Sequence, residues 1–214
     1  SSAASDVYKR QTLLPLNRGL KYSLSVLNVF IKACQMNIAD ALIEKAKKIK
    51  LLILDVDGVM TDNRLFYSDD GIETKTFYTR DGHGMVMLQK SDVEIGIITG
   101  RKSQLVTNRM RDLKVKHVYQ GVPDKLPTFL KLVEELELDL EEIAYVGDDI
   151  LDLPILMRVG FSVTPADADI EVKPRVDYIS EFEGGRGCVR EVCEIIMRAQ
   201  GTWQQHMDFY LRDL

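Results

Sequence analysis

The chain has 214 residues, of which 45% are hydrophobic and 29% charged, an ordinary composition for a globular protein. The formal net charge of −5 argues against a nucleic-acid partner, and no apolar run reaches the roughly eighteen residues of a membrane span. The three cysteines form no CxxC pair, which is typical of a reducing compartment, so we expect a cytoplasmic protein without a membrane partner.

The start of the chain differs in character from the rest. Residues 6–11, DVYKRQ, look like an in-frame translation of a sequencing adapter, and Met36 would be a natural start. The alternative is a signal-peptide core over 24–33, but no A-x-A cleavage pattern follows it. We therefore predict three parts: a non-native extension over 1–35, one domain over 36–201 and a tail over 202–214.

Apolar periodicity divides the domain into alternating strands and helices. In chain order we expect a helix over 37–48, a strand over 51–54, a hairpin of 64–67 with 72–78, a helix over 84–90, a strand over 94–98, a helix over 103–113, a strand over 117–119, a helix over 124–136, a strand over 143–146, a helix over 151–159, strands over 161–163 and 178–179, and a helix over 187–199. Such alternation produces right-handed βαβ units. The predicted fold class is therefore α/β, a three-layer Rossmann-like parallel sheet with a small hairpin insertion.

The first predicted strand runs directly into two carboxylates, Asp55 and Asp57, and then into Gly58. Side chains alternate along an extended chain, so both carboxylates lie on the same side. Two like charges held close together cost free energy unless a cation or a proton lies between them. Since parallel sheets bind ligands at the carboxyl ends of their strands, this segment predicts a Mg²⁺ site beside a reactive carboxylate.

Two further predicted strands also end in polar sequences, Thr99-Gly100-Arg101 in one case and Gly147-Asp148-Asp149 in the other. In a parallel sheet these ends meet at one edge, so we expect them to converge with the first acidic loop. Lys125 stands at the start of a predicted helix and would add a positive charge there.

The set DVDG, ITG, a lysine and GDD, in this order, resembles the haloacid dehalogenase superfamily of phosphotransferases over residues 50–201. The resemblance implies that Asp55 attacks phosphorus to form an aspartyl-phosphate and that Asp57 serves as general acid and base. It implies that Thr99 and Gly100 hold the phosphoryl group and that Lys125 binds both phosphate and nucleophile. The Mg²⁺ ligands that it implies are Asp55, Asp57, Asp148 and Asp149.

Each of these residues also has a structural interpretation. Asp55 could be a loop residue or a helix N-cap, and Thr99 could simply end a strand. Lys125 could be a solvated lysine at a helix start, and Asp149 could cap the following helix, a position that aspartate favours. The order of the whole set is what favours the catalytic interpretation.

The interval 63–98 holds only a hairpin and a short helix, so we expect no cap domain. Within the superfamily, DVDGVMTD, FYTRDGHG, IITGRKSQLV, HVYQGVPDK, YVGDDILDLPIL and GGRGCVREVCEIIMRAQG resemble the 3-deoxy-D-manno-octulosonate 8-phosphate phosphatases of lipopolysaccharide synthesis. That resemblance implies a Mg²⁺-dependent homotetramer with shared active sites. Since a site without a cap is open to water, we expect the hairpin over 64–78 to be the subunit contact. The substrate contacts that it implies are Asp57, Tyr78, Thr79, Arg80, Asp81, Gly82, Gly100, Arg101, Arg109, Lys125 and Arg186.

Val86 departs from that family, which often has an arginine at this place. The departure leaves open a sister activity on a nine-carbon, sialic-type sugar acid 9-phosphate. Two other classes stay open: a phosphotransferase or mutase, which normally needs a cap to exclude water, and a catalytically silent module. The function that we expect is hydrolysis of the eight-carbon sugar acid phosphate.

Overall fold

The computed structural model of the protein describes residues 40–212. The predicted extension over 1–35 lies outside these residues, as does the start of the first predicted helix, of which 40–47 is helical. Within the described part of the chain, no helix is both long and apolar enough to cross a membrane.

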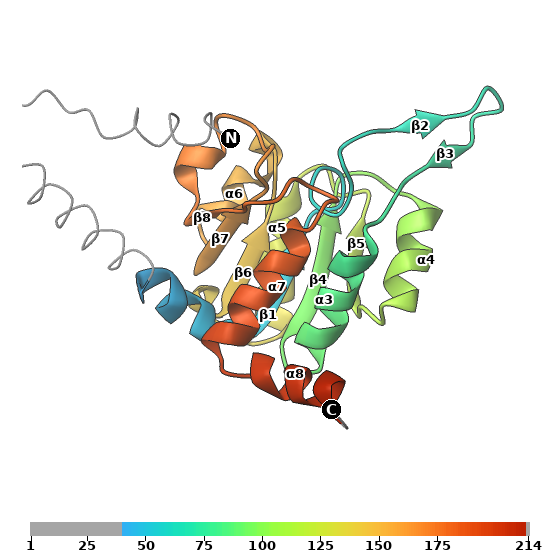
Figure 1. Ribbon diagram of the computed structural model, residues 1–214. Coiled ribbons are helices and arrows are strands. Elements are labelled where there is room, and N and C mark those ends of the chain that lie inside the picture. The colour runs from blue at the N-terminus through green and yellow to red at the C-terminus, as the bar shows by residue number, and fades with distance from the viewer. Residues whose placement is uncertain (1–39, 213–214) are drawn as a thin grey trace, which may run out of the picture. The chain divides into compact units, whose positions relative to one another are not determined.

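All strands of the main six-stranded sheet are parallel, in the order β5-β4-β1-β6-β7-β8 (Figure 1). They are β1 (Leu51–Leu54), β4 (Glu94–Thr99), β5 (His117–Gln120), β6 (Ile143–Val146), β7 (Phe161–Thr164) and β8 (Tyr178–Ile179). Every residue of β1 and β6 is buried, because helices cover both faces of the sheet. This burial explains why both segments are unbroken apolar runs.

Two apolar cores lie on the two faces of the sheet. One core contains residues from the helix at 40–47, α3 (Thr79–Gln89), α4 (Gln104–Asp112) and α7 (Cys188–Ala199). The other contains residues from α5 (Lys125–Glu135) and α6 (Leu153–Leu156). Short 3₁₀ turns occur at Leu140–Glu142, Ile150–Asp152 and Lys173–Arg175, and α8 (Trp203–Leu211) follows α7. The α/β three-layer prediction is confirmed.

Between β1 and β4 the chain forms a hairpin and then α3. Its strands β2 (Phe66–Tyr67) and β3 (Glu73–Thr74) are antiparallel and shorter than predicted, and they project from the body of the domain (Figure 1). The interval contains no folded cap, as the sequence predicts.

Helix α3 begins at Thr79, five residues before the predicted start at Gly84. Gly82 and Gly84 lower helix propensity, so the sequence suggests a loop there. In the structure a Cβ on Gly82 would collide with the guanidinium of Arg109, and a Cβ on Gly84 would lie 2.9 Å from Cδ of Arg190. The glycines therefore let α3 pack closely against its neighbours, and tertiary packing overrides propensity.

The predicted helix over 151–159 is also shorter in the structure. It begins as a 3₁₀ turn and continues as α6 for four residues, with Pro154 in its first turn. Proline has no N–H and fits only such a start, so the two short pieces replace one regular helix.

Candidate active site

The three motif-bearing strands β1, β4 and β6 end at one pocket of about 460 Å³. Its lining residues are Asp55, Asp57, Asn63, Thr99, Gly100, Arg101, Val122, Pro123, Lys125, Asp148, Asp149, Leu151 and Asp152. The structure thus brings together all the residues that the sequence predicts to be catalytic or metal-binding.

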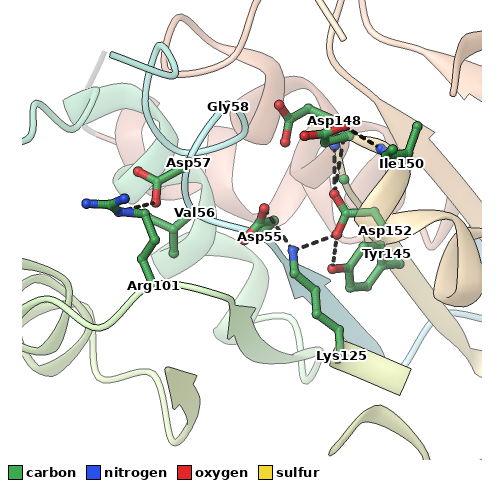
Figure 2. Close-up of polar contacts among 12 residues, drawn as sticks. Asp55, Val56, Asp57, Gly58, Arg101, Lys125, Tyr145, Asp148, Ile150 and Asp152 are labelled. Atoms are coloured by element: carbon green, nitrogen blue, oxygen red, sulfur yellow. Dashed lines mark hydrogen bonds and ion pairs between the residues drawn. The ribbon is translucent and has the colours of Figure 1, made fainter. Parts of the chain in front are cut away.

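A buried lysine links two carboxylates at the floor of the pocket (Figure 2). Nζ of Lys125 lies 2.9 Å from Oδ2 of Asp55 and donates to Oδ1 of Asp152 at 2.7 Å. Asp124 caps α5 by accepting from the N–H of Leu126, which fixes the start of the helix that carries Lys125. A buried ammonium requires such matched partners, so Lys125 holds Asp55 in a defined orientation.

Asp152 organises this cluster, although it is not among the predicted site residues. Its side chain is fully buried, and Oδ1 also accepts from the hydroxyl of Tyr145 at 2.6 Å. Oδ2 accepts from the backbone N–H groups of Asp148 and Asp149 at 3.1 and 3.3 Å. The signal that could have found it is an aspartate one helical turn after Asp148, where it can bond back to the turning loop.

We expect Asp152→Asn to lower the free energy of unfolding by about 3 kcal/mol, because it breaks a buried ion pair. Either orientation of an amide also places its NH₂ group against donors that now contact Asp152. Urea denaturation measures this loss. Asp92→Asn is the matched control, since Asp92 is exposed and has a φ of 61° that asparagine tolerates. Equal stabilities of the two variants would contradict the assigned role.

The pocket has the properties of a divalent-cation site. Single carboxylate oxygens of Asp55, Asp148 and Asp152 all lie within 4.8 Å of one another. Burial, followed by repulsion from neighbouring aspartates, raises the pKa of Asp55 to about 6 and that of Asp148 to about 8. Among the described residues, Oδ1 of Asp55 and Oδ1 of Asp148 are buried without a hydrogen-bond partner. Converging carboxylate oxygens with surplus negative charge fit a hard cation such as Mg²⁺.

Asp55 and Asp148 are the two donors that this geometry favours. Both oxygens of Asp152 are already hydrogen-bonded, so it orients Lys125 and the backbone of Asp148 and is not itself a metal donor. Asp149 is exposed, and its Oδ1 accepts from the N–H of Ile150 at 2.6 Å. This contact favours the capping alternative for Asp149, whose part in metal binding stays a prediction.

The loop that carries Asp57 is held from two sides. Gly58 has a φ of +87°, and a Cβ there would collide with the carboxylate of Asp148. The segment before α7 contacts the same loop. A Cβ on Gly184 would collide with the carbonyl oxygen of Gly58. The N–H of Gly185 donates to the carbonyl of Val59 at 2.9 Å. Only glycine permits these close approaches.

Comparison with known proteins places these motifs in a family. Residues 118–190 match the haloacid dehalogenase-like hydrolase model. The 3-deoxy-D-manno-octulosonate 8-phosphate phosphatase KdsC of Escherichia coli K12 is 46% identical over 171 residues, which cover 80% of this chain and 91% of that protein. The chain belongs to this phosphatase family.

Solved structures of the family have the same fold. The enzyme from Yersinia pestis is 43% identical, with a TM-score of 0.76 over 77% of this chain and 89% of its own. The enzyme from Moraxella catarrhalis, solved in complex with a magnesium ion, a phosphate ion and KDO, is 38% identical. It has a TM-score of 0.78 over 79% of this chain and 97% of its own.

The substrate contacts that the family resemblance implies fall into separate groups within one chain. Gly100, Arg101, Lys125 and Asp57 line the pocket described above. Tyr78, Arg80 and Arg186 line a second pocket beside α7. Thr79 is the exposed first residue of α3, and the guanidinium of Arg109 lies against Gly82 and 6.0 Å from the ring centroid of Phe77. The roles of these residues toward substrate stay predictions.

Asp81 is buried and faces α7. Its Oδ1 accepts from the N–H of Arg190 in the first turn of that helix at 2.9 Å, so α3 caps α7 across the interface. Burial raises the pKa of Asp81 to about 6, because desolvation outweighs the hydrogen bonds from Arg190 and Gly187. In this phosphatase the Asp81 carboxylate therefore joins α3 to α7, and this structural role is separate from its predicted contact with substrate.

We expect Asp81→Asn to change how stability depends on pH. Because the pKa of Asp81 is raised in the folded protein, the protonated carboxyl contributes fully to stability below about pH 4. This contribution is lost as the pH rises through about 6. The variant lacks this titration, so its stability relative to the wild type should rise by about 2 kcal/mol between pH 4 and pH 7. Urea denaturation at several pH values measures the difference, with Asp92→Asn as control. Parallel curves for Asp81→Asn and the wild type would contradict the prediction.

Proposed function

We propose that the protein is a Mg²⁺-dependent phosphatase that converts 3-deoxy-D-manno-octulosonate 8-phosphate to 3-deoxy-D-manno-octulosonate and phosphate. The observation that carries this proposal is the Asp55–Lys125 pair beside the cation site, with Asp57 two residues further on. The named relatives and the magnesium, phosphate and KDO complex of the Moraxella enzyme support the substrate.

The reaction has two phosphoryl transfers. Lys125 orients the carboxylate of Asp55, which attacks phosphorus while the bond to the sugar oxygen breaks. Asp57 donates a proton to the departing oxygen, and then takes one from the water that hydrolyses the aspartyl-phosphate. Thr99 and Gly100, at the end of β4, hold phosphoryl oxygens. Asp55 and Asp148 would hold Mg²⁺, which would supply positive charge to neutralise these oxygens.

Phosphate release from a panel of sugar phosphates tests the proposal. We expect turnover of the eight-carbon acid phosphate with Mg²⁺, and little turnover of the nine-carbon acid phosphate or of a neutral hexose phosphate. A preference for the nine-carbon substrate would favour the sister activity, which Val86 leaves open: this partly buried, uncharged residue of α3 packs against the core. No turnover of any member would favour the silent module.

A phosphotransferase or mutase is less consistent with the geometry. Such enzymes exclude water while the aspartyl-phosphate waits for its acceptor. Between β1 and β4 the structure has only the hairpin and α3, so this interval supplies no cap over the pocket. Transfer of phosphate to added sugars, measured against release to water, distinguishes the two activities.

We also propose that the protein is a cytoplasmic homotetramer in which the hairpin contacts neighbouring subunits. Leu65, Phe66, Tyr67 and Ile72 are all exposed on the hairpin, and an apolar surface of this kind favours a protein contact. Light scattering after size exclusion tests the assembly, and we expect Phe66→Ser with Ile72→Ser to dissociate it. A monomeric wild-type protein would contradict the proposal.

A further inference from the structure

Lys75 is a buried cation that none of the predicted site motifs includes. It follows β3 directly, at the foot of the hairpin, and its side chain is 0% exposed. Its ammonium contacts Oδ1 of Asp57 and lies 3.3 Å from Oε1 of Glu73. Long charged side chains are almost never fully buried unless they are paired, so these carboxylates are what permits the burial.

Asp57 is thereby held by one of its two oxygens. Oδ1 is the oxygen that contacts Lys75, and Oδ2 has no hydrogen-bond partner among residues 40–212. Nε of Arg101 is 3.9 Å from Oδ2, at the limit of an ion pair and too far for a hydrogen bond (Figure 2). The arrangement fixes the direction of the carboxylate and leaves the buried Oδ2 without a hydrogen-bond partner, in a residue that lines the pocket.

We infer that Lys75 is a positioning residue for the general acid Asp57, so that the hairpin foot determines where the leaving-group proton is delivered. This inference rests on the proposed acid role of Asp57. A carboxylate without a fixed partner samples several rotamers, and a displacement of about 1 Å in a proton donor costs on the order of 10²-fold in rate.

Glu73 gives the arrangement a second property. It contacts both cations, with Oε1 3.3 Å from Lys75 and Oε2 3.5 Å from Nη2 of Arg101. When Asp57 carries the proton that it delivers as general acid, Lys75 therefore keeps a carboxylate partner, and no buried charge is left alone. Glu73 thus keeps the ammonium of Lys75 beside Asp57 in both protonation states of Asp57.

The leaving group distinguishes this role from simple anchoring of the hairpin. A sugar alkoxide needs a proton as it departs, whereas p-nitrophenolate departs as a stable anion. The ratio kcat/KM reports only the steps through the first phosphoryl transfer, so activation of water later in the reaction does not enter. We expect Lys75→Met to lower kcat/KM for the sugar acid phosphate by about 10²-fold. For p-nitrophenyl phosphate the loss should be below about threefold, since that substrate does not need the acid.

Four further variants complete the experiment. Asp57→Asn should also lower kcat/KM for the sugar acid phosphate much more than for p-nitrophenyl phosphate. The double variant Asp57→Asn with Lys75→Met should have the same two kcat/KM values as Asp57→Asn alone. Lys116→Met is the matched control, because Lys116 is exposed and lies between α4 and β5. Lys75→Gln replaces Lys75→Met if the latter does not fold, as judged by circular dichroism.

Losses that differ by more than about tenfold between the two substrates support the inference, on the scale of one misplaced proton donor. Equal losses on both substrates overturn it and assign Lys75 to the fold alone, while the proposed phosphatase activity stands. Wild-type protein that hydrolyses neither substrate overturns the proposed function and this inference together.

Discussion

Asp55→Asn is expected to abolish phosphate release, with a loss in kcat of about 10⁴-fold or more, as when a covalent nucleophile is removed. The amide is a poor nucleophile, and it cannot form the aspartyl-phosphate. Lys125 retains its 2.7 Å bond to Asp152, so the variant should fold with a Tm close to that of the wild type. A continuous phosphate assay and a thermal melt measure the two quantities.

The control for this experiment is again Asp92→Asn, which makes the same chemical change at an exposed position outside the pocket. It should retain full activity. Residual turnover of Asp55→Asn within about tenfold of the wild type would show that another group attacks phosphorus.

Removal of Mg²⁺ should have the second largest effect. Chelation should abolish turnover, and saturating Mg²⁺ should raise the Tm of the metal-free protein by about 5 °C or more, as for a ligand well above its Kd. The reason is the mutual repulsion and burial of Asp55 and Asp148, which raise their pKa values to about 6 and about 8. A bound cation removes that repulsion.

The sign of the pH dependence follows from the same two groups. Raised carboxyl pKa values mean that the metal-free protein loses stability as pH rises through about 6 and then about 8. Metal binding requires the ionised carboxylates, so the rise in Tm with Mg²⁺ should grow over this window. Asp148→Asn should remove most of the rise. A Tm that does not respond to Mg²⁺ in the wild type would contradict the assignment of the donors.

Local sequence predicted the strand-end residues well, because a simple rule places them. The carboxyl ends of parallel strands share one edge, so Asp55, Thr99 and Asp148 had to converge once the strands were recognised. The role of Lys125 was predicted from its position at the start of a helix within the ordered set of motifs. These positions depend on the order of elements and on little else.

Asp152 and Lys75 could not be recognised in the same way, because their roles are set by burial and by partners distant in sequence. The ammonium of Lys125 reaches Asp152 across 27 positions, and Lys75 reaches Asp57 across 18. In sequence Lys75 is one more charged residue near a loop, and Asp152 is marked only by its position one helical turn after Asp148. The start of α3 was missed for a related reason, since Gly82 and Gly84 serve packing against other helices.

The contact of Gly184 and Gly185 with the loop after Asp57 bears on how the protein is made. Ribosomes build the chain from the N-terminus, so β1 with its acidic loop emerges before Gly184 and Gly185. The backbone that supports this loop is supplied by residues close to the C-terminal helices. The loop therefore reaches its final shape only after Gly184 and Gly185 have been made, so a chain truncated before this segment should lack phosphatase activity.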